Sequence, residues 1–161
     1  MTAALRWLDH TAFAIWVARS TSLWAFPTIL LLHTFGLALV VGTGYVVSLR
    51  LLGVAADMPL PPLRFLFRVL WAGFILSAVS GTALFISDAT AKAANPYFRT
   101  KMVFIAAATA NMILLQRDTA FAADGTFGAV RARARVLAAT AILFWTVALT
   151  AGRLIAYLPP S

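Results

Sequence analysis

His33 is the residue of this sequence best suited to chemistry, because it lies within a long apolar segment. It occurs in the stretch Leu31-Leu32-His33-Thr34-Phe35-Gly36, roughly 15 Å along a helix that starts about ten residues earlier. A neutral imidazole at membrane depth can be an axial ligand of haem b or a ligand of a metal ion. It can also be a packing residue that hydrogen-bonds to a serine, a threonine or a carbonyl of another helix. The sequence leaves both roles open.

Glycines follow His33 on the same segment. Gly36 lies one helical turn further along, and Gly42 lies beyond it. Glycine permits the close approach of either a neighbouring helix or a flat ligand. We therefore assign His33 and Gly36 to a candidate cofactor site, with His33 as the ligand of a haem iron or a metal ion.

A second histidine ligand within the chain is not expected. The other histidine, His10, precedes His33 by 23 residues, which corresponds to about 35 Å along one straight helix. Met102 and Met112 are alternative axial ligands, although methionine in a membrane span is usually a packing residue. A haem bound here would be five-coordinate, methionine-ligated or completed by another subunit.

Further polar residues are expected in the same half of an antiparallel bundle. They are Ser80, Asp88, Lys101, Asn111, Thr150 and Arg153. They could line a polar cavity, or several of them could extend to lipid headgroups. Because apolar residues follow Arg153, we expect its side chain to be buried, with Asp88 as the counter-charge.

Four apolar segments must position these residues. They span approximately residues 23–52, 65–86, 98–115 and 136–158, and about 20 residues of helix suffice to cross a bilayer. The connections are short and carry turn residues, at 57–62, 95–96 and 124–128. Short connections make consecutive helices antiparallel neighbours. The sequence thus predicts an all-α fold, a four-helix antiparallel transmembrane bundle that forms a single domain over residues 1–161.

Residues 1–19 differ from these spans. Apolar residues recur there at helical spacing, and charged residues occupy another face: Leu5, Leu8, Ala12 and Ile15 against Arg6, Asp9 and His10. This pattern predicts an amphipathic helix lying in the membrane interface, anchored by Trp7 and Trp16. The apolar run at 11–18 is short and precedes Arg19, so we expect an uncleaved helix rather than a signal peptide.

Composition excludes a water-soluble domain. Of 161 residues, 62% are hydrophobic and 11% are charged, compared with about 45–50% and about 25% in soluble domains. The net charge of +8 arises mainly at the ends of the apolar segments, where it meets lipid phosphates, so we expect the lipid bilayer as partner and no nucleic acid. There is no cysteine, and soluble-enzyme motifs are absent, so no catalytic residue is assigned.

The distribution of basic residues predicts the orientation. The termini and the second connection carry six (Arg6, Arg19, Lys92, Arg99, Lys101 and Arg153), and the first and third connections carry seven (Arg50, Arg64, Arg68, Arg117, Arg131, Arg133 and Arg135). Lys101 and Arg153 fall inside apolar segments. Leaving them out gives four basic residues at the termini and the second connection, against seven at the first and third connections. The positive-inside rule then predicts that the first and third connections face the cytoplasm and that both termini lie on the opposite side of the membrane.

Several stretches resemble known families. Residues 33–42, 49–53 and 80–85, together with the block Asn95-Pro96-Tyr97-Phe98-Arg99-Thr100-Lys101-Met102, resemble a four-helix family of bacterial inner-membrane proteins. More distantly, the chain is similar to the copper-resistance protein D family and the haem-dependent protoporphyrinogen oxidase family. The resemblance implies a histidine followed by a glycine in the first span, matched by His33 and Gly42, and an aromatic-lysine start to a later span, matched by Phe98 and Lys101. The oxidase family has a further histidine before its lysine, where this chain has Arg99 and Thr100.

Two functions follow from these observations. The first is a redox-type or cofactor-binding membrane protein, with haem b or a metal ion ligated by His33. The second is a non-catalytic accessory subunit that packs against other membrane subunits. A transporter is disfavoured because no internal repeat and no helix broken at the midplane is visible.

Overall fold

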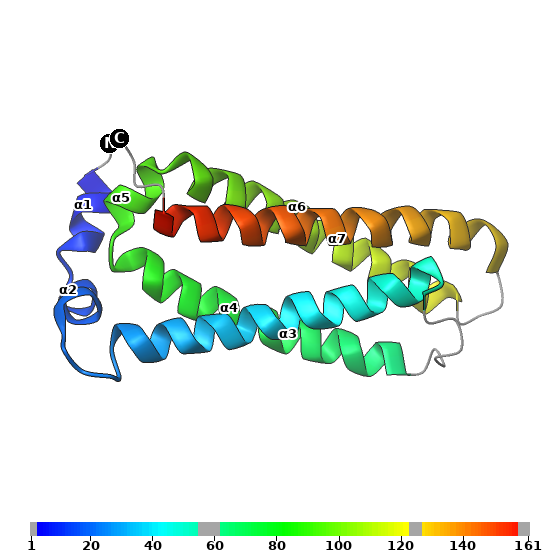
Figure 1. The fold of residues 1–161 in the computed structure, drawn as a ribbon, viewed down its shortest axis with the longest axis horizontal. Coiled ribbons are helices and arrows are strands. Elements are labelled where there is room, and N and C mark those ends of the chain that lie inside the picture. The colour runs from blue at the N-terminus through cyan, green and yellow to red at the C-terminus, as the bar shows by residue number, and fades with distance from the viewer. Residues whose placement is uncertain (1–2, 55–61, 123–126, 158–161) are drawn as a thin grey trace.

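The computed structural model describes residues 3–54, 62–122 and 127–157. These residues form seven helices and no strand (Figure 1): α1 (Ala3–Asp9), α2 (Ala12–Arg19), α3 (Phe26–Leu52), α4 (Pro62–Ile86), α5 (Ala89–Ala94), α6 (Pro96–Ala122) and α7 (Phe127–Tyr157). The predicted all-α helix bundle is confirmed. Most of the expected turns at 57–62 and 124–128 lie outside the described residues.

Four of these helices are long and apolar enough to cross a membrane. The apolar stretches are Phe26–Leu52, Phe65–Ile86, Pro96–Asp118 and Ala132–Ile155. Large apolar side chains such as Phe35, Ile75 and Val103 point outward and are more than half exposed. Burying that surface requires lipid rather than water. The chain is therefore a multi-pass membrane protein, as its composition predicts.

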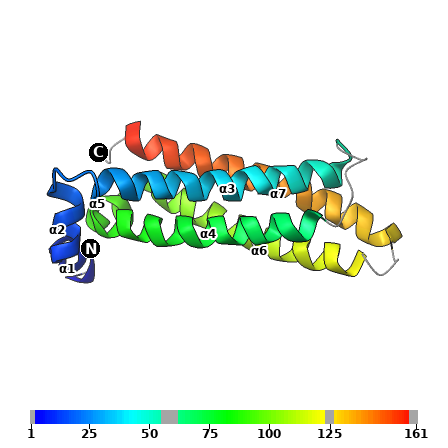
Figure 2. The ribbon, with the colours of Figure 1, turned by 90° about the horizontal axis from the view of Figure 1, so that it is seen from below.

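The long helices pack as two antiparallel hairpins. Helix α3 pairs with α4, α6 pairs with α7, and α3 also packs on α7 and so joins the hairpins (Figures 1 and 2). The α3–α4 contact is close because both helices place glycine at the crossing. A Cβ atom added at Gly36 would lie 2.6 Å from the backbone nitrogen of Ser77, and one added at Gly73 would lie 2.6 Å from Cβ of Leu39.

Side-chain bonds connect the hairpins at several levels. The Trp71 indole N–H donates to Oε1 of Gln116 at 2.7 Å and links α4 to α6. The rings of Phe85 and Phe98 stack with their centroids 5.3 Å apart and link the same two helices near the opposite end. Leu70, Met112 and Trp145 belong to the apolar core that the hairpins share. His33 contacts α4 at Ser77, which lies between Trp71 and Phe85, two α4 residues that contact α6.

The amino-terminal segment forms two short helices that run across one end of the bundle (Figure 2). The single helix expected for residues 1–19 is interrupted at Thr11. Its hydroxyl donates to the carbonyl of Leu8 at 2.8 Å, ending α1, and accepts from the backbone N–H of Ala14, beginning α2. This capping favours a break over a continuous helix. The expected anchors Trp7 and Trp16 are both exposed.

Candidate functional site

The imidazole of His33 is held by helix α4. Its Nδ1 lies 3.0 Å from the carbonyl oxygen of Ser77, and the hydroxyl oxygens of Ser77 and Ser80 lie 3.3 Å from the same nitrogen. A carbonyl only accepts, so Nδ1 carries the proton and donates it. The Ser80 hydroxyl already donates to Leu76 at 2.6 Å, which leaves it an acceptor towards His33. In the neutral ring, Nε2 then keeps a free lone pair.

No hydrogen bond to Nε2 of His33 occurs in the part of the chain that the structure describes. The ring is half-buried and packs against Gly81, where an added Cβ atom would lie 2.9 Å from Cε1 of the imidazole. Helix α4 therefore orients the ring through Nδ1 and packs against the ring around Cε1, and no hydrogen bond uses Nε2. In histidines that ligate a metal, the nitrogen that does not bind the metal commonly donates to a carbonyl in the same way.

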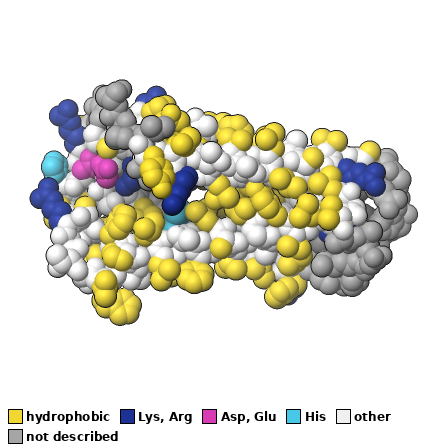
Figure 3. Space-filling model, in the orientation of Figure 1, with side chains coloured by type: hydrophobic (Ala, Val, Ile, Leu, Met, Phe, Trp, Pro, Cys, Tyr) yellow, Lys and Arg dark blue, Asp and Glu magenta, His cyan; other side chains and the backbone are white. Residues whose placement is uncertain are grey.

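Lys101 of α6 lies in the same region of the bundle. Its half-buried side chain runs along Gly152 of α7, where an added Cβ atom would lie 3.5 Å from Nζ. The positive charge of Lys101 lies close enough to His33 to act on it electrostatically. Among the described residues, the Lys101 ammonium has neither a hydrogen bond nor an ion-pair partner. A ligand bound at His33 would therefore also meet an unpaired cation. On the face seen in Figure 3, hydrophobic side chains cover the middle of the molecule and most basic side chains lie towards its two ends.

Of the six other polar residues expected to cluster, Ser80 and Lys101 lie near His33. Asn111 lies deeper and donates to the carbonyl of Leu137 and the hydroxyl of Thr140, both at 2.9 Å. Asp88 and Thr150 are exposed. The α6–α7 hairpin thus uses Asn111 for its own packing.

The expected burial of Arg153 against Asp88 is wrong. Arg153 is exposed, and its guanidinium lies 5.6 Å from the ring centroid of Tyr157, one turn further along α7. Asp88 lies beyond the end of α4, as the N-cap residue of α5. Arg153 lies near the carboxyl end of the described part of α7, and its long side chain extends outward instead of requiring a partner inside the bundle.

Gly36 lies in the contact between α3 and α4 and does not face an open space. Of the two neighbours expected for it, a helix or a flat ligand, helix α4 occupies the position, since the backbone of Ser77 leaves no room for a Cβ atom. The alternative methionine ligands also lie elsewhere: Met112 is buried in the core against Gly44, and Met102 is exposed. His10 is exposed beside α1.

Ser77 and Gly152 complete the surroundings of the site, and their contribution was not expected from the sequence. Ser77 and Gly81 share a helix face, a spacing that indicates close helix packing. That spacing does not reveal which side chain occupies the face. Gly152 gives no such signal, because its role depends on Lys101 reaching across from another helix.

A conventional metal site is not formed by the described residues. Within ranges 3–54, 62–122 and 127–157, no three histidine, cysteine or acidic side chains come together. The nearest charged neighbour of His33 is a lysine, which repels a bare divalent cation. This arrangement fits a ligand that needs one nitrogen donor and carries an anionic group of its own.

A second polar cluster joins the amino-terminal segment to α5. The carboxylate of Asp9 accepts from the backbone N–H of Ala89 at 2.6 Å and from that of Thr90 at 3.3 Å. Hydrogen bonding from Thr90 and Ala89 lowers the pKa of Asp9. Nearby, the Lys92 ammonium donates to the carbonyl of Leu84 and the hydroxyl of Ser87, and burial lowers the pKa of Lys92.

Comparison with protein-family models, with curated proteins and with solved structures found no match to this chain.

Proposed function

We propose that this chain is a small cofactor-binding protein of the bacterial inner membrane, with haem b ligated by Nε2 of His33. The observation that carries this proposal is the His33 ring itself. Its Nδ1–H is fixed on the Ser77 carbonyl, while its Nε2 has no partner among the described residues. A packing histidine would be expected to satisfy both nitrogens inside the bundle.

Lys101 favours haem over a bare metal ion. An unpaired ammonium near His33 suits a ligand with carboxylate groups, and haem b carries two propionates. When bound, haem b would supply one-electron chemistry at its iron. The roles of the chain would be to ligate through His33, to orient that ring through Ser77 and Gly81, and to neutralise an acidic substituent through Lys101. The resemblance to four-helix haem-dependent membrane proteins agrees with this proposal.

The absorption spectrum of the detergent-purified protein tests the proposal. We expect a Soret band in the wild type that is lost in His33→Ala. His10→Ala is the matched control, because it removes the other histidine of the chain, and it should keep the band. Lys101→Met should weaken haem retention without abolishing ligation.

A colourless wild-type preparation, reconstituted with haem without any Soret shift, would contradict cofactor binding. The accessory-subunit function would then account better for the chain. A band that survives in His33→Ala would contradict the assignment of the ligand.

We also propose that both termini face the periplasm. The support is the distribution of basic residues, with seven at the end of the bundle that carries the first and third connections. In this orientation α1, α2 and α5 lie at the periplasmic surface of the membrane.

A further inference from the structure

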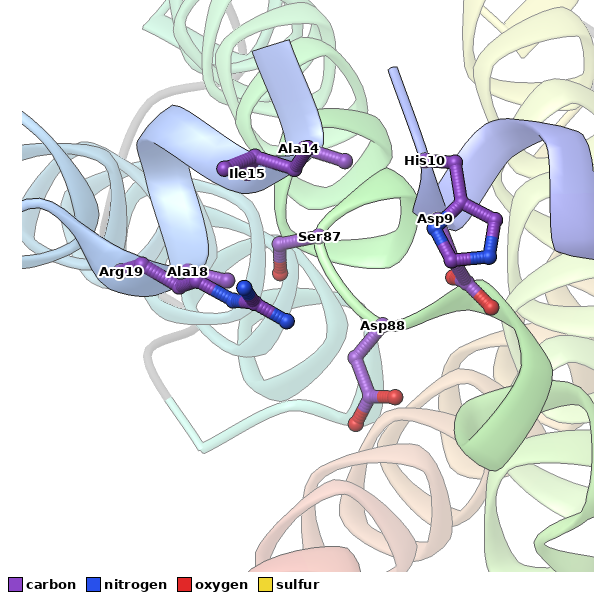
Figure 4. A pocket seen from close by; sticks show the side chains of 8 residues that line it. All are labelled: Asp9, His10, Ala14, Ile15, Ala18, Arg19, Ser87 and Asp88. Atoms are coloured by element: carbon purple, nitrogen blue, oxygen red, sulfur yellow. The ribbon is translucent and has the colours of Figure 1, made fainter. Parts of the chain in front are cut away.

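A cavity separates α2 from the junction between α4 and α5. Its volume is about 450 Å³, and its lining includes Asp9, His10, Arg19, Ser87 and Asp88. Figure 4 shows Arg19 extending from α2 and Asp88 extending from the other side. Arg19 and Asp88 therefore border the cavity from different parts of the fold, while the carboxylate of Asp9 is engaged by the backbone N–H groups of Ala89 and Thr90.

Neither of these charged side chains makes a hydrogen bond or an ion pair among the described residues, although the positive charge of Lys92 acts on Asp88. The Arg19 guanidinium has no hydrogen bond or ion pair among the described residues, and no ion pair joins it to Asp88. The basic neighbour Lys92 is engaged with Leu84 and Ser87. A charged pair that borders one cavity without closing it leaves room for a ligand with both charges.

Asp88 does not cap its own helix, α5, with its side chain. It stands at the N-cap position of α5, but its side chain makes no capping hydrogen bond. Asp9 supplies that bond from α1, through its contacts to Ala89 and Thr90. The Asp88 side chain thus lines the cavity without a bond to its own helix.

The cavity lies at the depth of lipid headgroups. Helix α2 crosses the end of the membrane-spanning helices (Figures 1 and 2) and exposes Phe13, Ile15 and Trp16. Leu23 and Trp24, which follow it, are each more than 70% exposed. Exposed aromatic residues at the ends of spans mark the membrane–water interface.

We propose that this cavity binds the headgroup of phosphatidylethanolamine, with its phosphate on Arg19 and its primary ammonium on Asp88. Guanidinium binds phosphate through two parallel N–H donors, and carboxylate accepts strongly from an ammonium. Phosphatidylglycerol offers no cation to Asp88. Phosphatidylcholine has a cation without N–H donors. The ethanolamine headgroup therefore matches both side chains better than either.

The test measures lipid selectivity of the full chain in nanodiscs with equal parts of these three phospholipids. Native mass spectrometry then counts the lipids retained by the released protein. We expect phosphatidylethanolamine to be enriched by about two- to fivefold, the size that one partly exposed charge pair provides. Asp88→Asn should remove its advantage over phosphatidylglycerol, and Arg19→Gln should lower retention of all three lipids. Arg6→Gln is the matched control, since Arg6 is exposed on α1 and does not line the cavity.

Two experiments can overturn the proposal. The first does so if it shows equal retention of the three lipids by the wild type, or an enrichment that Asp88→Asn and Arg19→Gln leave unchanged. The second is the titration of lipid-free protein with soluble phosphoethanolamine. If that compound binds with the same dependence on Arg19 and Asp88 while no lipid is enriched, the cavity takes a soluble zwitterion rather than a lipid. Both positions are exposed, and unchanged helicity and melting temperature of the variants confirm that they fold.

Discussion

At the scale of single residues, hydrogen-bond partners decide what each polar side chain can do. His33 uses Nδ1 on the Ser77 carbonyl, and the direction of that bond leaves Nε2 as a free acceptor. Its depth in the span is evident from the sequence, but the Ser77 carbonyl is not, because a backbone acceptor on another helix has no sequence signature. The sequence therefore predicts that a serine, a threonine or a carbonyl contacts His33, without identifying the Ser77 carbonyl as that partner.

Arg153 illustrates the opposite outcome. The apolar residues after it suggest burial, but sequence position does not tell which way a long side chain extends. In the structure it lies over Tyr157 on its own helix and is exposed. A counter-charge at Asp88 is consequently unnecessary.

Asp9 gives a pH-dependent prediction at this scale. Its folded-state pKa lies below the ordinary value of 3.8, so its bonds to Ala89 and Thr90 contribute stability fully above that pH. The contribution is lost as the pH falls from 3.8 through the lower pKa of the folded chain. Amide hydrogen exchange in detergent should show protected Ala89 and Thr90 at pH 6, with protection factors that fall below pH 3.8.

The Asp9→Asn variant provides the comparison. It should show weaker protection of the same two amides at pH 6 and little further loss in acid. Equal protection of both amides in variant and wild type at pH 6 would exclude Asp9 as the link between α1 and α5.

At the scale of elements, apolar run length predicts the spans well, because a helix that crosses lipid must be apolar over about 20 residues. All four expected segments correspond to long helices. The break at Thr11 was missed because apolar spacing continues across it. A local hydrogen bond from one hydroxyl, not the pattern of side chains, ends α1 there.

The α3–α4 crossing gives a matched pair of glycine variants. Gly36→Ala would place a Cβ atom 2.6 Å from the Ser77 nitrogen and 2.9 Å from the Gly73 carbonyl oxygen. Backbone atoms cannot yield without moving the helix, so we expect a loss of about 1–3 kcal/mol in stability. Gly42→Ala, on the same helix, meets nothing within 4 Å and should be neutral or stabilising by up to about 1 kcal/mol.

Thermal unfolding of both variants in the same detergent measures this difference. Gly36→Ala should also disturb His33, because Gly36 contacts the backbone of Ser77, whose carbonyl accepts from Nδ1 of His33. If Gly36→Ala unfolds at the same temperature as Gly42→Ala, the close crossing of the two helices is not as described.

At the scale of the whole molecule, the four spans fix which ends of the helices share a side of the membrane. If each of the four candidate spans among the described residues crosses the membrane once, we expect the two termini on one side and the connection between the third and fourth spans on the other. Reporter fusions after Ser161 and within the connection near Asp124 should therefore report opposite compartments. The same compartment for both fusions would contradict the number of spans, and a periplasmic signal from the Ser161 fusion would support the proposed orientation.

The central claim is that Nε2 of His33 ligates haem, and chemical rescue tests it most directly. His33→Gly leaves a space that free imidazole can fill, so a lost ligand can be restored without restoring the side chain. We predict that purified His33→Gly binds little haem, and that millimolar imidazole recovers the Soret band and the haem-to-protein ratio of the wild type. His10→Gly should bind haem normally with or without imidazole. Wild-type haem content in His33→Gly without imidazole would contradict the account.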